Sequence, residues 1–153
     1  MKSMGYIAEL RKLVGHRTLI MPCACLIIGD GNGNILLQKR VDDGTWGYHG
    51  GAVEIDESVE DALRREVKEE LNIEPKEIEL LGIYSGPAYH HVYPNGDHVS
   101  AIDIVYTCCH YTGKIALQED EVTGLAWYNK DTLPENISGN HKQPILDYLS
   151  KYS

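Results

Sequence analysis

The chain has 153 residues, a length that predicts a single domain. Hydrophobic residues make up 42% and charged residues 24%, which excludes wholesale disorder. Fourteen Lys and Arg residues against 23 Asp and Glu residues give a net charge of −9. Such a charge disfavours binding to bulk nucleic acid, because that binding depends on Lys and Arg contacts to phosphate.

The longest apolar run, Thr18–Ile28, contains Pro22 and is shorter than the roughly 18 residues that a transmembrane helix needs. The N-terminus lacks the basic, apolar and small-residue pattern of a signal peptide. We therefore expect a cytoplasmic protein with no membrane partner. The cysteines lack the spacing of a zinc site and are expected to be free thiols; they are Cys23, Cys25, Cys108 and Cys109.

The first half of the chain is predicted to contain one helix followed by strands. The apolar residues Ile7, Leu10 and Val14 have helical spacing, and Asp30–Asn34 has the composition of a hairpin turn. The predicted elements are a helix over about residues 4–15 and strands over Thr18–Gly29, Ile35–Arg40 and Tyr48–Val53.

The second half is predicted to contain two helices and three strands. Ser58 is a good N-cap for the first of these helices, and Asn72 can adopt the left-handed conformation that ends it. The predicted elements are a helix to about Leu71, strands over Ile78–His91, His98–Tyr111 and Leu125–Asn129, and a helix over His141–Tyr152. Residues 1–153 are thus expected to form one mixed α/β domain with several antiparallel strand pairs.

The helix that starts at Ser58 has an unusual distribution of charge. At about 100° per residue, Glu66, Glu69 and Glu70 overlap the edge of the apolar stripe instead of lying on the opposite face. One interpretation is a solvated acidic face paired with Arg and Lys. The other is a site for a hard divalent cation, which takes oxygen ligands from several carboxylates at once. Gly50–Gly51, which allows close backbone approach, favours the second.

The spacing of these residues resembles the Nudix box, GX5EX7REUXEEXGU, of the Nudix hydrolase family, where U is an aliphatic residue. In this chain the pattern is Gly51, Glu57, Arg65-Glu66-Val67, Glu69-Glu70 and Asn72-Ile73. Asn72 stands where the pattern has Gly, and the other fixed positions match. A second departure lies upstream, where His49 precedes the double glycine in place of the Pro that is common in the family. His49 is either an ordinary loop residue, which is the interpretation that we prefer, or a cation that reaches the phosphates.

The resemblance implies an α/β/α sandwich around a mixed β-sheet, of the α+β class. It implies Mg²⁺-dependent hydrolysis, with Mn²⁺ as an alternative, of the pyrophosphate bond in a nucleoside diphosphate linked to another group. Carried over by position, the implied metal ligands are Glu66, Glu69, Glu70 and the carbonyl of Gly50. Glu66 is also the implied residue for orienting or deprotonating the water, with Arg65 holding the carboxylates in place. Glu57 is implied to brace the junction between the loop and the helix, just outside the direct metal ligands.

The same resemblance implies a further acid from a distal loop, for which we choose Glu121 over Glu119 and Asp120. The residues that we expect to bind substrate are Arg40, Tyr48 and Tyr89. In relatives, a Pro near the position of Pro87 accompanies ADP-ribose hydrolysis, and a Tyr slightly further on accompanies hydrolysis of dinucleoside polyphosphates. This chain has both, so the substrate stays open among ADP-ribose, ADP-sugars, dinucleoside polyphosphates and nucleoside triphosphates.

Two alternative functions remain. Within the enzyme class, the protein could remove pyrophosphate from RNA 5′ ends, although its net charge of −9 argues against a nucleic-acid partner. From a different class, it could be a non-catalytic domain that senses a nucleotide, although the intact glutamate cluster argues against this. The partner is thus expected to be a nucleotide-type small molecule, and the oligomeric state is open, with a homodimer as one outcome.

Overall fold

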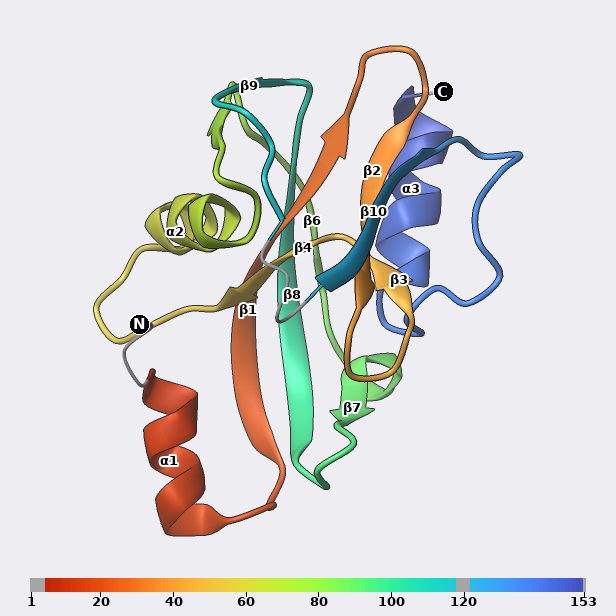
Figure 1. Ribbon diagram of the computed structural model, residues 1–153. Coiled ribbons are helices and arrows are strands. Elements are labelled where there is room, and N and C mark those ends of the chain that lie inside the picture. The colour runs from red at the N-terminus through yellow and green to blue at the C-terminus, as the bar shows by residue number, and fades with distance from the viewer. Residues whose placement is uncertain (1–4, 118–121, 153) are drawn as a thin grey trace.

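The computed structural model describes residues 5–117 and 122–152, which form a mixed β-sheet with helices on both faces (Figure 1). The helices are α1 (Tyr6–Val14), α2 (Val59–Leu71) and α3 (Lys142–Tyr152). The strands of the main sheet are β1 (Leu19–Gly29), β2 (Ile35–Arg40), β3 (Trp46–Gly47), β4 (His49–Ala52), β6 (Glu79–Tyr84), β7 (His90–Val92), β8 (His98–Cys108) and β10 (Val122–Tyr128).

The main sheet follows the order β10-β2-β1-β8-β6, with β3, β4 and β7 pairing at its margins. Strands β1 and β8 are parallel, with Met21 opposite Ala101 and Cys23 opposite Asp103. The other strand pairs in this sheet are antiparallel. Helices α2 and α3 cover opposite faces (Figure 1), so the predicted sandwich around a mixed sheet is confirmed.

Strand β1 supplies both hydrophobic cores because successive side chains of a strand point to opposite faces. Cys25 and Ile27 pack on the α3 side, whereas Leu26 and Ile28 pack on the α2 side. All four cysteines are free thiols, as predicted, and Cys109 is the exposed one. The full burial of β1 from Cys23 onward makes it the rigid centre on which the cleft is built.

Helix α2 begins and ends as its sequence predicts. The Ser58 side chain accepts a hydrogen bond of 3.1 Å from the Asp61 N–H. Asn72 closes the helix at φ 61° and ψ 32°, in the left-handed region. Between these caps, Leu63 and Val67 are fully buried against the sheet. The caps therefore fix which residues of α2 face the sheet.

The structure corrects the predicted strand Ile78–His91. Gly86, at φ 100°, breaks it, and Pro87–Tyr89 form a 3-10 helix between β6 and β7. Both parts still pair antiparallel with β8, so the predicted hairpin is confirmed. Sequence analysis also missed a separate two-stranded sheet formed by β5 (Glu74–Lys76) and β9 (His110–Thr112). Its signal was obscured by Pro75, which normally argues against a strand.

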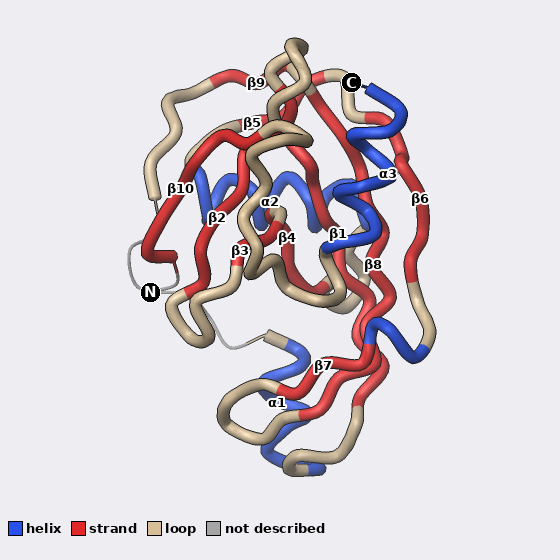
Figure 2. The backbone as a smooth tube through the Cα atoms, turned by 90° about the vertical axis from the view of Figure 1, so that its right-hand side faces the viewer, coloured by secondary structure: helices blue, strands red, loops and turns tan. Residues whose placement is uncertain are grey.

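Helix α1 matches the predicted N-terminal helix and packs beside the ends of β1, β7 and β8 that lie far from β5 and β9 (Figures 1 and 2). The Arg11 guanidinium donates hydrogen bonds to the carbonyl oxygens of Gly15, Arg17 and His98. No helix in residues 5–117 and 122–152 is long and apolar enough to span a membrane. The cytoplasmic location stays a prediction.

The left-handed conformation of Asn72 generates a stability prediction. Replacing Asn72 with Ala should lower the free energy of unfolding by about 1 kcal/mol, because a Cβ-bearing residue without a polar side chain pays a steric cost there. Asn72→Gly should match or exceed wild type, because Gly adopts this conformation without that cost. Urea denaturation of both variants measures the difference, and equal loss in the two would contradict the conformational explanation.

Candidate active site

A cleft of about 790 Å³ opens on the sheet, lined by parts of α1, β1, β4, α2 and β8 and by the residues just before α3. This volume lies in the range of clefts that hold small-molecule ligands. The acidic residues of α2 lie at one side of it, beside the glycines of β4. It is therefore the place where the residues singled out in the sequence meet.

Gly50 and Gly51 are required by close contacts on both sides of β4. Gly50 has φ 145°, and a Cβ there would lie 2.2 Å from the carbonyl oxygen of Ala24. A Cβ on Gly51 would lie 2.4 Å from Cδ of Glu66. The contact at Gly50 is with backbone, which cannot move aside, so only glycine fits there; at Gly51 a Cβ would displace the Glu66 carboxylate. The double glycine thus brings backbone directly against a carboxylate.

The three α2 glutamates of the family pattern, Glu66, Glu69 and Glu70, differ in burial. Glu66 and Glu70 are each 7% exposed, whereas the Glu69 side chain is 38% exposed. The Gly50 N–H donates a long hydrogen bond of 3.4 Å to Glu70 Oε2. Acidic side chains are rarely buried unless they are paired or bind a metal. Two of the three carboxylates therefore lie on the buried side of the helix, and Glu69 lies at the exposed rim.

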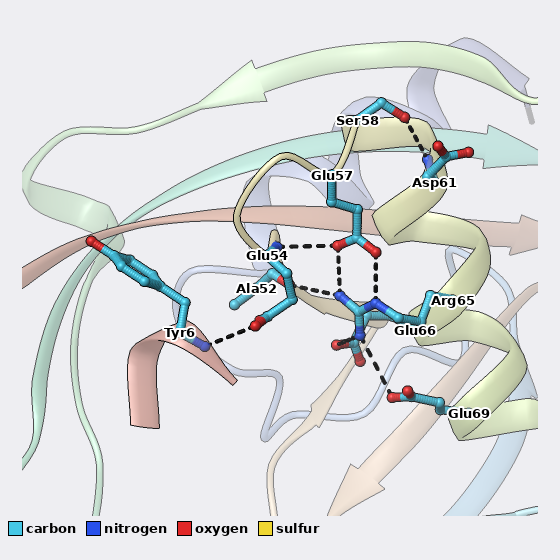
Figure 3. A network of polar contacts seen from close by, with 9 residues as sticks. All are labelled: Tyr6, Ala52, Glu54, Glu57, Ser58, Asp61, Arg65, Glu66 and Glu69. Carbon is cyan, nitrogen blue, oxygen red and sulfur yellow. Dashed lines mark hydrogen bonds and ion pairs between the residues drawn. The ribbon is translucent and has the colours of Figure 1, made fainter. Parts of the chain in front are cut away.

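Arg65 joins these carboxylates to the loop before α2 (Figure 3). Its Nε and one terminal nitrogen donate to the two oxygens of Glu57 at 2.7 and 2.9 Å, and it also donates to the Ala52 carbonyl oxygen at 3.1 Å. The other terminal nitrogen lies 2.8 Å from Glu66 Oε1 and 3.7 Å from Glu69 Oε2. The hydrogen bonds from Arg65 hold the pKa of Glu57 below its ordinary value, so Glu57 is ionised at neutral pH.

The chemistry of this donor set suits a hard divalent cation, since carboxylate oxygens are the ligands that Mg²⁺ prefers. Within the described part of the chain, no three His, Cys, Asp or Glu side chains are already arranged around one point as metal ligands. Instead, Glu66 and Glu69 are held by Arg65. A bound cation would share these carboxylates with Arg65.

His49 is a buried strand residue, which corrects its interpretation as an ordinary loop residue. It lies in β4 with 0% exposure, and its Nε2 donates to the Leu36 carbonyl oxygen at 3.1 Å. Its other ring nitrogen lies 2.9 Å from the side-chain amide of Gln38. Burial lowers the pKa of His49 to about 4, so the ring is neutral at neutral pH. The sequence did contain a signal for this position, because His49 falls inside the strand predicted over Tyr48–Val53.

A second polar group on the cleft consists of Tyr48, Asp103 and His141, of which the sequence had indicated Tyr48 alone. The Tyr48 hydroxyl donates to Asp103 Oδ2 at 2.6 Å, and the Tyr48 ring stacks on His141 with centroids 3.8 Å apart. Burial raises the pKa of Asp103, which is 2% exposed. The signal that could have revealed Asp103 is an acidic residue at a position of the strand where its neighbours Ala101 and Val105 point inward.

The other predicted residues are placed as follows. Arg40 lines the cleft, with its guanidinium 2.6 Å from Asp42 and over the ring of Tyr93. Tyr48 also lines the cleft, as described above. Tyr89 is not among the residues that line it; its ring is buried beside Tyr84, 6.1 Å between centroids. Glu121, Glu119 and Asp120 lie outside the described residues, so the choice among them stays a prediction.

The burial of His141 generates a prediction for acid stability. Burial lowers its pKa to about 3 from 6.5, and its Nδ1 accepts a hydrogen bond from the Tyr48 N–H. The folded state therefore binds this proton less readily than the unfolded state, and stability is lost as pH falls from 6.5 toward 3, at about 1.4 kcal/mol per pH unit.

His141→Asn should be less stable at pH 8 but should lose less stability between pH 6.5 and 4.5 than wild type does. Urea denaturation across this range measures the slopes. His110→Asn is the matched control, because His110 is exposed, and its slope should equal that of wild type. An unchanged slope in His141→Asn would show that His141 does not set the acid sensitivity.

Comparisons with known proteins agree with this geometry. The family model for the NUDIX domain matches residues 20–148. An ADP-ribose pyrophosphatase of Methanocaldococcus jannaschii is 34% identical over 148 residues, covering 94% of this chain and 82% of that protein. A MutT-like protein of Streptomyces ambofaciens is 29% identical, covering 77% of this chain and 70% of that protein.

Among solved structures, the MutT NUDIX hydrolase from Burkholderia pseudomallei superimposes with a TM-score of 0.71 at 28% identity, covering 84% of this chain and 98% of that chain. The match over residues 20–148 includes the whole of β4, α2 and the loop between them, and therefore the network around Arg65. The chain belongs to the Nudix hydrolase family and is a hydrolase of phosphorus-containing anhydrides.

Proposed function

We propose that the protein hydrolyses the pyrophosphate bond of a nucleoside diphosphate linked to a second moiety, with Mg²⁺ or Mn²⁺ as cofactor. The observation that carries this proposal is the position of Glu66 and Glu70, which are buried beside Gly50 and Gly51 at the wall of the cleft. Burying carboxylates costs free energy. A positive ion and a phosphate group in the cleft would account for that cost.

The metal ligands in this proposal are Glu66, Glu69 and Glu70, with the Gly50 carbonyl as a fourth. A bound Mg²⁺ supplies charge neutralisation at the phosphates and lowers the pKa of a water molecule. Glu66 orients the attacking water and accepts its proton, since a general base has to lie within hydrogen-bond reach of that proton. Arg65 fixes the rotamers of Glu66 and Glu69, and Glu57 fixes Arg65 in turn.

ADP-ribose is the substrate to test first. The M. jannaschii relative that carries the name ADP-ribose pyrophosphatase is similar over nearly the whole chain, which supports this choice. Arg40 lines the cleft and carries the positive charge that a second phosphate would need. An RNA 5′ end is a weaker candidate because the chain carries a net charge of −9. A nucleotide sensor without catalysis is the alternative outside the enzyme class.

Hydrolysis of a substrate panel tests the proposal. ADP-ribose, ADP-glucose, a dinucleoside polyphosphate, a nucleoside triphosphate and triphosphorylated RNA are incubated with the protein, with Mg²⁺ or with chelator, and the products are separated by chromatography. We expect AMP and ribose 5-phosphate from ADP-ribose with Mg²⁺ and no product with chelator. Tight nucleotide binding without any product would identify a sensor instead, and cleavage of RNA alone would favour the RNA alternative.

Glu70→Gln separates catalysis from structure. We expect the rate with Mg²⁺ to fall by about 100-fold or more, because a displaced cation no longer stabilises the transition state. Without metal, the free energy of unfolding should stay equal or rise by about 0.2–0.5 kcal/mol, because a like charge near Glu66 is removed. Enzyme assays and urea denaturation in chelator measure the two effects.

Glu60→Gln is the matched control, since Glu60 is exposed on the same helix and should change neither quantity by much. We expect Mg²⁺ to raise the melting temperature of wild type and of Glu60→Gln, and to raise that of Glu70→Gln less. A Glu70→Gln protein with normal activity and a normal response to Mg²⁺ would refute the assignment of Glu70 as a ligand.

A further inference from the structure

Helix α1 lies outside the residues that the family domain matches, yet it lines the catalytic cleft. The match begins at residue 20, whereas α1 ends at Val14. Three residues on this helix, Ile7, Ala8 and Arg11, line the same cleft as the glutamates of α2. We call these three residues the α1 wall. This wall is a part of the cleft that this chain adds to the matched domain.

The α1 wall is fastened at both ends. At its start, the Tyr6 N–H donates to Glu54 Oε1 at 2.8 Å, which places a carboxylate at the helix N-terminus (Figure 3). At its other end, Arg11 donates to the His98 carbonyl oxygen and lies 3.6 Å from Asp97. The helix is therefore held against the loop before α2 and against the start of β8.

The contact at Glu54 also connects α1 to the catalytic residues. The Glu54 N–H donates to Glu57 Oε1 at 3.1 Å, and Glu57 is the partner of Arg65 (Figure 3). One short loop thus sets the position of the α1 wall and of the guanidinium that holds Glu66. The distance between the α1 wall and the Arg65 guanidinium is therefore fixed, and a substrate in the cleft would contact the two at that distance.

The same cleft has an apolar lining in which Met21 is half-buried, whereas Val99 and Ala101 are buried. The strand register puts Met21 directly opposite Ala101. No residue of α1 is buried, and Ile7 is only half-buried. An amphipathic helix normally buries its apolar face against the protein. Here part of that face is left for an occupant of the cleft.

The distance along β1 suits a nucleotide lying lengthwise in the cleft. Cys25 pairs with Gly50, at the catalytic end, and Met21 precedes it by four residues on the same face of the strand. At about 3.3 Å per residue this separation is about 13 Å. A ribose and its phosphates can occupy that interval when the phosphates lie beside Gly50.

We propose that Ile7 and Ala8 of the α1 wall pack against the nucleobase of the substrate and select substrates by the size of that base, an inference that rests on the proposed function. A base offers flat apolar faces that match Ile7, Ala8 and Met21, whereas a free sugar presents hydroxyl groups that need polar partners. Arg11 acts as a positioning residue, because its hydrogen bonds fix the helix and leave the base contact to Ile7 and Ala8.

Steady-state kinetics on two substrates that differ only in the base test this proposal. ADP-ribose and cytidine diphosphate ribose are compared for wild type, Ile7→Trp and Leu13→Trp. Ile7→Trp should raise KM for the purine substrate by about tenfold and for the pyrimidine substrate by much less, with kcat changed by less than about twofold. Leu13→Trp is the matched control: Leu13 lies on α1, is 83% exposed and does not line the cleft, so both KM values should stay unchanged.

Glu54→Ala should weaken the attachment of α1 and raise KM for ADP-ribose. Glu54→Gln should keep the KM of wild type, because Gln still offers an oxygen to the Tyr6 N–H. Thermal denaturation verifies that each variant is folded. Equal KM increases for the two substrates in Ile7→Trp, or none, would overturn the α1 wall as a selector of base size. The substrate panel described above tests the proposed function separately: a wild type that cleaves no nucleoside diphosphate derivative would overturn that function and this inference with it.

Discussion

The bidentate ion pair between Arg65 and Glu57 is the interaction on which the candidate site depends. It fastens the second turn of α2 to the loop that leaves β4, and the same guanidinium reaches Glu66 and Glu69. Three glutamates within two turns of one helix repel one another. A planar donor group that contacts several carboxylates at once reduces this repulsion and fixes their geometry.

That contact requires β4 to lie very close to both of its neighbours. The absence of side chains at Gly50 and Gly51 lets β4 pair with β1 while touching α2, so the backbone and Glu66 meet. The burial of β1 on both faces gives this junction a rigid base, because Leu26 and Ile28 pack under α2 while Cys25 and Ile27 pack under α3. Strand β1 therefore determines both how α2 and α3 pack on the sheet and where the candidate site residues lie.

Burial decides which of the titratable groups that line the cleft carry a charge. His49 and His141 are kept neutral by desolvation, so the positive groups lining the cleft are the arginines at its edges. Asp103 is buried and accepts a hydrogen bond from the Tyr48 hydroxyl. The carboxylates at the α2 side thus form the acidic surface that a cation would meet. A phosphate group would approach only together with such a cation.

The sequence by itself determined the local elements and the family pattern. Helical spacing, the Ser58 cap, the Asn72 cap and the Asp30–Asn34 turn each act through a few neighbouring residues, which is why the helices and the β1–β2 hairpin were predictable. The family pattern around Gly51 and Glu70 is equally local, so the metal-binding hypothesis needed no coordinates.

Only the tertiary structure decided which distant residues complete the cleft. The break at Gly86 and the β5–β9 pair depend on contacts between segments far apart in the chain, and so does the stacking of Tyr48 on His141. The hydrogen bond from Tyr6 to Glu54 joins residues 48 positions apart, and no local pattern indicates it. Local chemistry sets what each segment can form, whereas packing of the sheet sets which segments meet. The place of α1 beside the glutamates is the clearest result of that packing.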